Sequence, residues 1–388
     1  MTAPEFTLAE YLLLPELKLI QVNWSLGLLV CEKRSEAEVC HRCATLCRSG
    51  YDRRWITVRD GLLREKAIRL RIQKRRFYCP NCRKPFTESI EGILPRRKTT
   101  QRLRRELREA CERFVDLKSV RETFKVSNDT VYRALYEQLR YSTQERVNTP
   151  WPAVIGLDEH GWRRREYVTM VVNHSRRYLI ELVPGKSLEQ LKEHLAYIPG
   201  RENVRYVTMD MCESFRNFSA LYFPEAKRIA DKFHVLRMLS GPIMKKRRQI
   251  TGKNADRKAR GLLLVNGKTL GYFEKLAIDR YLQNHPELRE LYHWKEALHG
   301  FYRIRGQRRA RIALEAMLDR MKGSELPEIK RLRKTLLNWK DEVLNYFEAR
   351  LTNARVEGFN NKASLVRRRA YGYRSHSNYR LRLLSACA

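Results

Sequence analysis

Three acidic residues that lie far apart in the sequence have the residue type and setting of a divalent-metal site. Asp158 follows the apolar run 153–157, and Asp210 follows the run 204–209. If these runs are parallel neighbours in one sheet, the two carboxylates repel each other by roughly 4 kcal/mol at an effective dielectric constant near 20. Mg²⁺ or Mn²⁺ would remove that cost, because both ions bind carboxylate oxygens. Glu357, on an expected basic helix, would complete the set.

These carboxylates together would support phosphoryl transfer assisted by two metal ions. One ion activates water or a 3′-hydroxyl group, the second stabilises the leaving oxygen, and the two ions lie roughly 3.5–4 Å apart. Taken singly, each acid is more simply explained as a solvated charge or a capping residue, so the prediction depends on all three lying together. Glu159 is a rival ligand next to Asp158, but side-chain alternation along a strand points it elsewhere.

The sequence also contains a set of thiolate ligands. Two Cys-x-x-Cys pairs are separated by residues 44–78, and their members are Cys40, Cys43, Cys79 and Cys82. Four thiolates suit tetrahedral Zn²⁺, and such a site is structural because it leaves no open position for a substrate. His41 or Cys47 could replace one ligand, and four unrelated buried cysteines would be the simplest alternative.

Residues 54–59 and 67–72, between the two cysteine pairs, have the composition of two strands with a turn at Asp60-Gly61. Two cysteine pairs around a hairpin form a zinc ribbon, and zinc binding contributes on the order of 10–16 kcal/mol to the folding of such a small module. Basic side chains surround the hairpin, and we expect them to contact DNA: Arg69, Arg71, Lys74, Arg75 and Arg76.

The next segment is basic and has the apolar period of helices. We expect helices over 100–117 and 117–124, and a third over 130–139, with Val131, Leu135 and Leu139 on its apolar face. A short helix, a tight turn and a longer helix make a helix-turn-helix, although any packing of three helices would leave a similar pattern. The residues expected to face outward and read the major groove are Thr130, Tyr132, Arg133 and Tyr136.

Residues 150–242 alternate apolar strands with helical patterns. Three expected antiparallel strands, 153–158, 167–172 and 178–183, are followed by alternating helices and strands. This is the element order of a ribonuclease H-like core. In that order the first and fourth strands are parallel neighbours, so the two aspartates that end them would lie side by side.

Residues 243–345 are helical almost throughout, which indicates an all-helical insertion into the core. Trp294 is expected to be buried there, with a wedge between DNA bases as the alternative. A basic run in this segment could follow DNA, although charge runs are usually solvated faces: Lys245, Lys246, Arg247 and Arg248. The last segment carries the Glu357 helix and side chains that suit phosphate: Asn361, Lys362, Arg367, Arg368 and Arg369.

The predicted fold class is therefore a multidomain α+β protein. Its expected parts are a zinc-binding ribbon at 1–97, a helix-turn-helix at 98–149, the first part of a ribonuclease H-like α/β core at 150–242, the helical insertion at 243–345, and the last part of the core at 346–388.

Composition narrows the function class. The formal net charge is +35 and the pI is about 10.1, and such an excess favours a polyanionic partner, most commonly nucleic acid. Nine cysteines without a secretory signal argue against a disulfide scaffold. No apolar run reaches the 18 residues of a membrane span. We expect a cytoplasmic, DNA-associated protein with no membrane partner.

Several motifs beside the cysteine pairs resemble the ISL3 family of insertion-sequence transposases: Gly156-Leu157-Asp158-Glu159, Thr208-Met209-Asp210-Met211, residues 230–235, residues 355–362 and residues 368–373. The resemblance covers nearly the whole chain. It implies a bacterial DDE transposase that binds terminal inverted repeats and target DNA and uses Asp158, Asp210 and Glu357 as ligands of Mg²⁺ or Mn²⁺. It also implies the zinc-binding domain, and a homodimer is expected because two DNA ends must be brought together.

The motif Asp231-Lys232-Phe233-His234 is similar to a signature of several DDE families in which the histidine lies near the scissile phosphate. His234 could equally be a core histidine. Two other functions remain as alternatives: a zinc-containing helix-turn-helix DNA-binding regulator without catalysis, and another ribonuclease H-like enzyme such as a nuclease or Holliday-junction resolvase.

Overall fold

The computed structural model describes residues 13–113, 116–144, 148–163, 166–252 and 257–388. The chain divides into two compact units, 1–141 and 142–388, and each is described by itself. The start of the expected ribbon domain, residues 1–12, and positions 114–115 of the first expected helix lie outside the described residues.

The first unit contains a mixed sheet. It consists of β1 (Leu17–Asn23), β2 (Leu28–Lys33), β5 (Gly50–Leu63), β6 (Lys66–Cys79) and β7 (Lys84–Thr87), in the order β1-β2-β6-β5 with β7 on β6. Its core lies on one face, where alternate residues such as Leu70 and Ile72 of β6 are fully buried. A separate two-stranded piece pairs β3 (Glu38–Val39) with β4 (Leu46–Cys47).

The expected hairpin forms, but its strands are longer and its turn lies elsewhere. Leu63 pairs with Lys66, and Arg64 and Glu65 form a two-residue turn with φ of 48° and 65°, the positive values that a type I′ turn requires. The turn predicted at Asp60-Gly61 is wrong, because the register shift of β5 falls there instead. The buried Asp60 carboxylate accepts a hydrogen bond from Thr100 Oγ1 (2.7 Å), which fixes this stretch of the strand.

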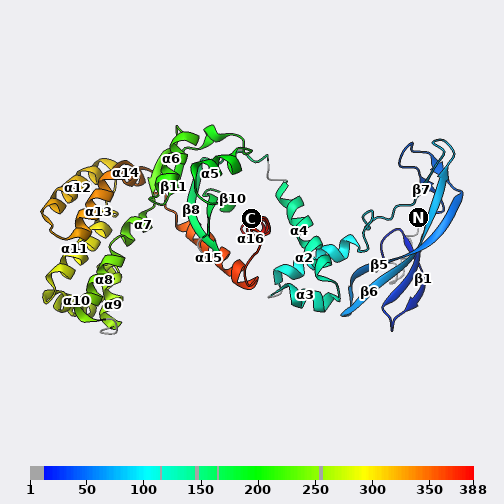
Figure 1. Cartoon of the computed structure of the whole chain (residues 1–388), viewed down its shortest axis with the longest axis horizontal. Coiled ribbons are helices and arrows are strands. Elements are labelled where there is room, and N and C mark those ends of the chain that lie inside the picture. Colours follow the sequence, from blue (N-terminus) through cyan, green and yellow to red (C-terminus); the bar gives the residue numbers. More distant parts are fainter. Residues whose placement is uncertain (1–12, 114–115, 145–147, 164–165, 253–256) are drawn as a thin grey trace, which may run out of the picture. The chain divides into compact units, whose positions relative to one another are not determined.

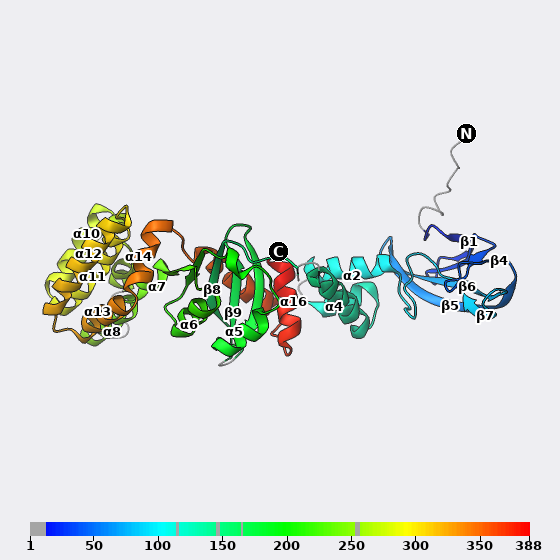
Figure 2. The ribbon, with the colours of Figure 1, turned by 90° about the horizontal axis from the view of Figure 1, so that it is seen from above.

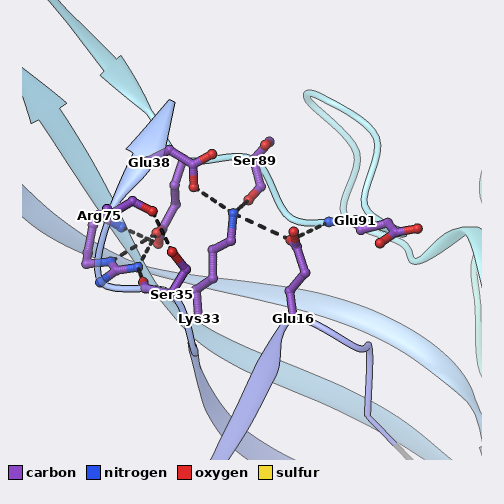
Figure 3. A network of polar contacts seen from close by, with 9 residues as sticks. Glu16, Lys33, Ser35, Glu38, Arg75, Ser89 and Glu91 are labelled. Carbon is purple, nitrogen blue, oxygen red and sulfur yellow. Dashed lines mark hydrogen bonds and ion pairs between the residues drawn. The ribbon is translucent and has the colours of Figure 1, made fainter. Parts of the chain in front are cut away.

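A buried lysine at the end of β2 connects this sheet to the segment after β7 (Figure 3). Lys33 Nζ lies 2.6 Å from Glu38 Oε2 and 3.5 Å from Glu16 Oε2, and it donates to Ser89 O at 2.9 Å. Because its ammonium group is paired and hydrogen-bonded, Lys33 can be buried without the cost of an isolated charge.

Three helices follow the sheet: α2 (Gln101–Arg113), α3 (Leu117–Phe124) and α4 (Asn128–Gln144). The predicted apolar face of α4 is confirmed, since Val131, Leu135 and Leu139 are buried. Tyr136 is also buried, so the prediction that it faces outward is wrong. Its ring packs on that of Tyr132, one turn earlier in α4, with the ring centroids 5.5 Å apart.

The second unit is built on a sheet with the predicted strand order. Its strands are β8 (Val154–Arg163), β9 (Glu166–Asn173), β10 (Tyr178–Pro184), β11 (Tyr206–Met209) and β12 (Lys227–Ala230), in the order β10-β9-β8-β11-β12. The first three are antiparallel, whereas β8, β11 and β12 are parallel. The first and fourth strands are thus parallel neighbours, as predicted. One detail differs: β8 continues beyond Asp158 because β9 pairs with it as far as Arg163.

Helices cover both faces of this sheet (Figure 1). On one face, α5 (Leu188–Leu195) and α6 (Glu213–Tyr222) bury Leu191, Leu195, Phe215 and Phe218 against the strands. On the other, α15 (Ala354–Arg369) and α16 (His376–Ala386) bury Val356 and Tyr379. This mixed α/β arrangement agrees with the coarse fold class expected from the sequence.

Helices fill most of the chain between β12 and α15, and several of them form the bundle in Figure 2. They are α7 (Lys232–Arg237), α8 (Ser240–Thr251), α9 (Arg257–Leu264), α10 (Tyr272–Gln283), α11 (Pro286–Phe301), α12 (Gln307–Arg320), α13 (Pro327–Asn338) and α14 (Lys340–Ala349). One continuous apolar cluster joins the bundle to the sheet. Trp294 is 6% exposed and belongs to this core, as expected.

No helix among the described residues combines the length and the apolar character needed to cross a bilayer.

Candidate active site and metal sites

The acidic residues singled out in the sequence line one pocket of the second unit. In the parallel pairing of β8 with β11, Leu157 lies opposite Met209, so the residues that follow them, Asp158 and Asp210, are neighbours at the same edge of the sheet. Glu357, in the first turn of α15, lines the same pocket. The pocket therefore gathers three carboxylates that are separated by up to 199 residues (357 minus 158) in the chain.

Asp158 is buried and held at both carboxylate oxygens. Its Oδ1 accepts the backbone N–H of Glu159 at 2.8 Å, and its Oδ2 accepts Asn360 Nδ2 at 2.6 Å. Burial raises the pKa of Asp158 to about 8, and the charge of Asp210 adds to the rise. Two carboxyl groups placed side by side out of water explain this direction.

Asp210 lies against a histidine. His234 Nδ1 is 2.9 Å from Asp210 Oδ1 and 3.1 Å from Asp231 Oδ2, but only the contact with Asp231 has hydrogen-bond geometry. Asp210 Oδ1 is thus a buried oxygen that accepts no hydrogen bond from the described residues. The contacts with Asp210 and then with Asp231 raise the pKa of His234 to about 10. His234 therefore lies at the pocket rather than in the core.

Asp231 belongs to the same site, although the motif at 231–234 predicted a role only for His234. Ala230 of β12 lies opposite Met209 of β11, so Asp231 follows the third parallel strand at the same sheet edge. Among the described residues, Asp210, Asp231 and His234 have ligand atoms within 4.8 Å of one another. The predicted trio of Asp158, Asp210 and Glu357 is more widely spaced than that limit. An aspartate directly after the fifth strand was the signal that could have revealed Asp231.

Other polar residues complete the rim of the pocket. Glu159 does line it, contrary to the expectation from strand alternation, but its carboxylate is paired with Lys186 at 2.6 Å. Asn361 lines the pocket together with Glu357, as their spacing on one helix predicts. Asn360 lines it too, and the sequence reasoning missed this residue because its role depends on the position of Asp158.

The basic residues near the end of α15 have different surroundings. Lys362 and Arg368 are exposed and Arg369 is half-buried. Arg367 Nη1 donates to Gly161 O of β8, so this guanidinium group helps to hold α15 against the sheet.

The four predicted cysteines form one cluster in the first unit. Cys40 Sγ lies 3.7 Å from Cys82 Sγ, and Cys43 Sγ lies 3.4 Å from Cys79 Sγ, and all four sulfurs lie within 4.8 Å of one another. A hydrogen bond with Thr45 lowers the pKa of Cys43 to about 6, which favours the thiolate that binds metal.

Neither alternative zinc ligand joins this cluster. The ring of His41 packs edge-on against Phe86 with centroids 5.9 Å apart, and Cys47 Sγ donates to Thr45 O. Tetrahedral Zn²⁺ fits the four clustered thiols.

The basic side chains of the β5–β6 hairpin are of two kinds. Arg69 and Arg71 are exposed on β6, and the Arg71 guanidinium lies 5.1 Å from the ring centroid of Trp55. Arg75 instead pairs with the buried Glu88 at 2.9 Å, and Arg76 pairs with Asp52 at 3.0 Å. Burial lowers the pKa of Lys74.

The basic run of α8 is only partly on the surface. Lys245 and Arg248 are exposed, and Lys246 is paired with Glu287 at 2.5 Å. Arg247 is 3% exposed, so the expectation that its side chain follows DNA is wrong. Arg247 lies one turn after Ile243 on α8, so its side chain is on the helix face that packs into the bundle.

In α4, Tyr132 and Arg133 face solvent as predicted, and Thr130 is half-buried. Arg133 Nε lies 2.9 Å from Asp129 Oδ1.

Residues 155–383 match the model of the ISL3 family of DDE transposases, which is described as transposase. A similar protein is the transposase for insertion sequence element IS1001 of Bordetella parapertussis, 24% identical over 365 residues that make up 90% of this chain and 88% of that protein. The sheet and pocket described above thus belong to a transposase. The chain is a member of the ISL3 family, as the resemblance in its motifs predicted.

Proposed function

We propose that this chain is the transposase of an insertion sequence, which binds the terminal inverted repeats, cuts the DNA there and joins the ends to a target. Asp158, Asp210 and Glu357 are its metal-binding carboxylates. The observation that carries the proposal is that these three residues line one pocket, with the two aspartates on adjacent parallel strands. In this view the sheet of the second unit is a ribonuclease H-like core.

Mg²⁺ or Mn²⁺ fits the oxygens of this pocket. Asp210 Oδ1 is buried and accepts no hydrogen bond from the described residues, and the raised pKa of Asp158 reflects first its burial and then the charge of Asp210 beside it. Two such ions would activate the attacking oxygen and stabilise the leaving oxygen. The chain's own residues orient the acids: Asn360 holds Asp158, and the position of α15 sets that of Glu357.

His234 has a separate part in this proposal. Asp231 holds its Nδ1, and 42% of the imidazole side chain remains exposed. An imidazole fixed in this way can donate a hydrogen bond from Nε2 to a DNA phosphate oxygen. Its place in the pocket favours this role over that of a core histidine.

The first unit would recognise the DNA ends. The cysteine cluster fits a structural Zn²⁺, which would stabilise a ribbon that presents Arg69 and Arg71. Helices α3 and α4 would form a helix-turn-helix, with Tyr132 and Arg133 directed at the major groove. The net charge of +35 supports a DNA partner. Two copies would act together because both ends of the element must be joined, and the protein would work in the bacterial cytoplasm.

A strand-transfer assay tests the proposal. The purified full-length chain is mixed with Mg²⁺, a labelled duplex that carries one terminal repeat of its own element, and a target plasmid. We expect cleavage at the repeat and covalent joining of the label to the plasmid. Binding without cleavage would indicate a regulator, and cleavage of branched DNA alone would indicate a resolvase; either result overturns the proposal.

A further inference from the structure

One buried amide connects all the elements that carry the candidate active site. Asn353 lies directly before α15, at the point where the chain returns from the helical bundle, and it is 3% exposed. A buried amide side chain needs partners for its donors and acceptor. The partners of Asn353 come from strands β8 and β11 and from the residue that follows β12.

The first contact fixes α15 against β8. Asn353 Nδ2 donates to Leu157 O at 2.9 Å, and Leu157 is the residue before Asp158. Gly156 shows how close this approach is: a Cβ atom there would lie 2.8 Å from Val356 Cγ2 and 3.0 Å from Asn353 Oδ1. A larger residue at position 156 would therefore displace the start of α15, the ring of His174, whose Nε2 such a Cβ atom would meet at 2.6 Å, or both.

The second contact reaches β11. Thr208 Oγ1 donates to Asn353 Oδ1 at 2.5 Å, and Thr208 lies two residues before Asp210. The same hydroxyl lies 2.8 Å from His174 Nε2. All three side chains that form these hydrogen bonds are buried, so the bonds are shielded from water. Loss of one side chain would leave a buried polar group without a hydrogen bond, which is costly.

The backbone of Asn353 makes two further connections. Its N–H donates to Asp231 Oδ1 at 2.8 Å, while the other oxygen of Asp231 holds His234. Its carbonyl accepts the N–H of Val356 at 2.8 Å and that of Glu357 at 3.1 Å. The first turn of α15, with Glu357 in it, is therefore anchored at Asn353.

We infer that Asn353 is a positioning residue that fixes the Glu357 helix against the strands that bear the two aspartates. This inference rests on the proposed function, because it assigns to the amide the geometry of the proposed metal-binding carboxylates. The helical segment between β12 and α15 separates Glu357 from the aspartates in the sequence. Asn353 connects the start of the Glu357 helix to the strands that bear the aspartates.

The test compares Asn353→Ala with Asn173→Ala in the full-length chain. Asn173 is a matched control: it is also buried, and its Oδ1 accepts the N–H groups of Ser175 and Arg176, both at 2.9 Å, in the β9–β10 turn. Thermal unfolding measures the structural cost of each change. Mn²⁺ affinity, followed by electron paramagnetic resonance of the free ion, measures the geometry of the carboxylates without relying on catalysis. Cleavage rate and affinity for end DNA complete the set.

We expect Asn353→Ala to weaken Mn²⁺ binding and to slow cleavage, each by about 10- to 100-fold, which is the usual effect of removing a residue that orients ligands. Its affinity for end DNA should stay within about twofold of wild type, since recognition is assigned to other residues. Asn173→Ala should lose thermal stability without either effect. If both variants bind Mn²⁺ and cleave alike, Asn353 has only a structural role and the inference fails.

A second pair covers the case in which Asn353→Ala does not fold. Thr208→Val removes the hydroxyl that bonds to Asn353, whereas Thr169→Val removes a buried hydroxyl that donates only to Gly185 O among the described contacts. We expect weaker Mn²⁺ binding for Thr208→Val alone, and equal Mn²⁺ binding in the two variants would overturn the inference. If the wild type binds Mn²⁺ but does not cut end DNA, the proposed function fails, while the Mn²⁺ comparison still decides the role of Asn353.

Discussion

Asp231 Oδ2 lies 3.1 Å from His234 Nδ1, so a carboxylate that follows one strand of the sheet holds an imidazole one helical turn later. The same aspartate caps α7 and accepts the amide of Asn353. His234 is thus held in place at the pocket by a residue that is itself fixed to the start of α15.

Replacing His234 by Gln should slow cleavage by about 100-fold. This is the lower end of the loss in rate that is usual when a side chain that transfers or shares a proton with the reacting group is removed. Affinity for end DNA should be unchanged, because the imidazole acts at one phosphate. His194→Gln is the matched control, since His194 is a half-buried residue of α5 that does not line the pocket. Cleavage kinetics measure both variants, and a His234→Gln variant that cuts at the wild-type rate would remove this residue from the mechanism.

The contribution of His174 and His160 to stability should fall as the pH falls from about 6.5 to about 4, whereas the raised pKa of Asp158 acts in the opposite direction. Burial, and then the charges of Arg355 and Arg367 respectively, lower the pKa of both His174 and His160 from 6.5 to about 4. In this window the unfolded chain binds protons at these rings and the folded chain does not, so acid favours unfolding. Each ring should remove about 2 kcal/mol between pH 7 and pH 5.

Urea unfolding at the two pH values measures this slope. His174→Gln should reduce the difference between pH 7 and pH 5, whatever its stability at pH 7, whereas His194→Gln should leave the difference as in wild type. An unchanged pH dependence in His174→Gln would show that this ring does not carry the effect.

The cysteine cluster predicts which thiols are needed for zinc. Cys43→Ser should lower the zinc content of the purified chain and weaken binding to end DNA, because Cys43 Sγ lies within the cluster. Cys47→Ser should retain zinc, although Cys47 is only four residues from Cys43, because its thiol is not one of the four that lie within 4.8 Å of one another. Elemental analysis of the two purified variants measures their zinc content. Loss of zinc from Cys47→Ser, with zinc retained in Cys43→Ser, would show that Cys47 and not Cys43 is a zinc ligand.

Arg133 should contribute to sequence recognition rather than to general affinity. If its guanidinium contacts a base, Arg133→Ala should weaken binding to the terminal repeat by about 1–3 kcal/mol and affect unrelated DNA much less. Lys322→Ala, an exposed residue of the helical bundle, is the control for simple charge loss. Fluorescence anisotropy with both duplexes tests this, and equal losses on the two sequences would assign Arg133 to backbone contacts.

The sequence predicted the sheet of the second unit well because its signals are local. Apolar runs mark the strands, the lengths of the connections set the pairing, and Asp158 and Asp210 follow apolar runs that could be recognised directly. The cysteine pairs were equally clear, since their spacing predicted the cluster of four thiols that the structure contains.

What the sequence did not reveal depends on contacts between distant elements. Arg247 is buried because the bundle packs around it. In the β5–β6 hairpin the turn lies at Arg64-Glu65, and Asp60, where the turn was expected, is buried and bonded to Thr100, 40 residues away. Asn353 is the clearest example, since an asparagine before a helix is normally a local cap, whereas its side chain here connects two strands.

The most direct test of the account is the cleavage rate of Asp158→Asn, Asp210→Asn and Glu357→Gln, each with its affinity for end DNA and with Glu348→Gln as a control outside the pocket. We predict that each of the three variants binds end DNA as wild type does and cuts it at least about 100-fold more slowly, while Glu348→Gln cuts normally. Wild-type cleavage by any of the three would contradict the claim that these carboxylates form the catalytic site.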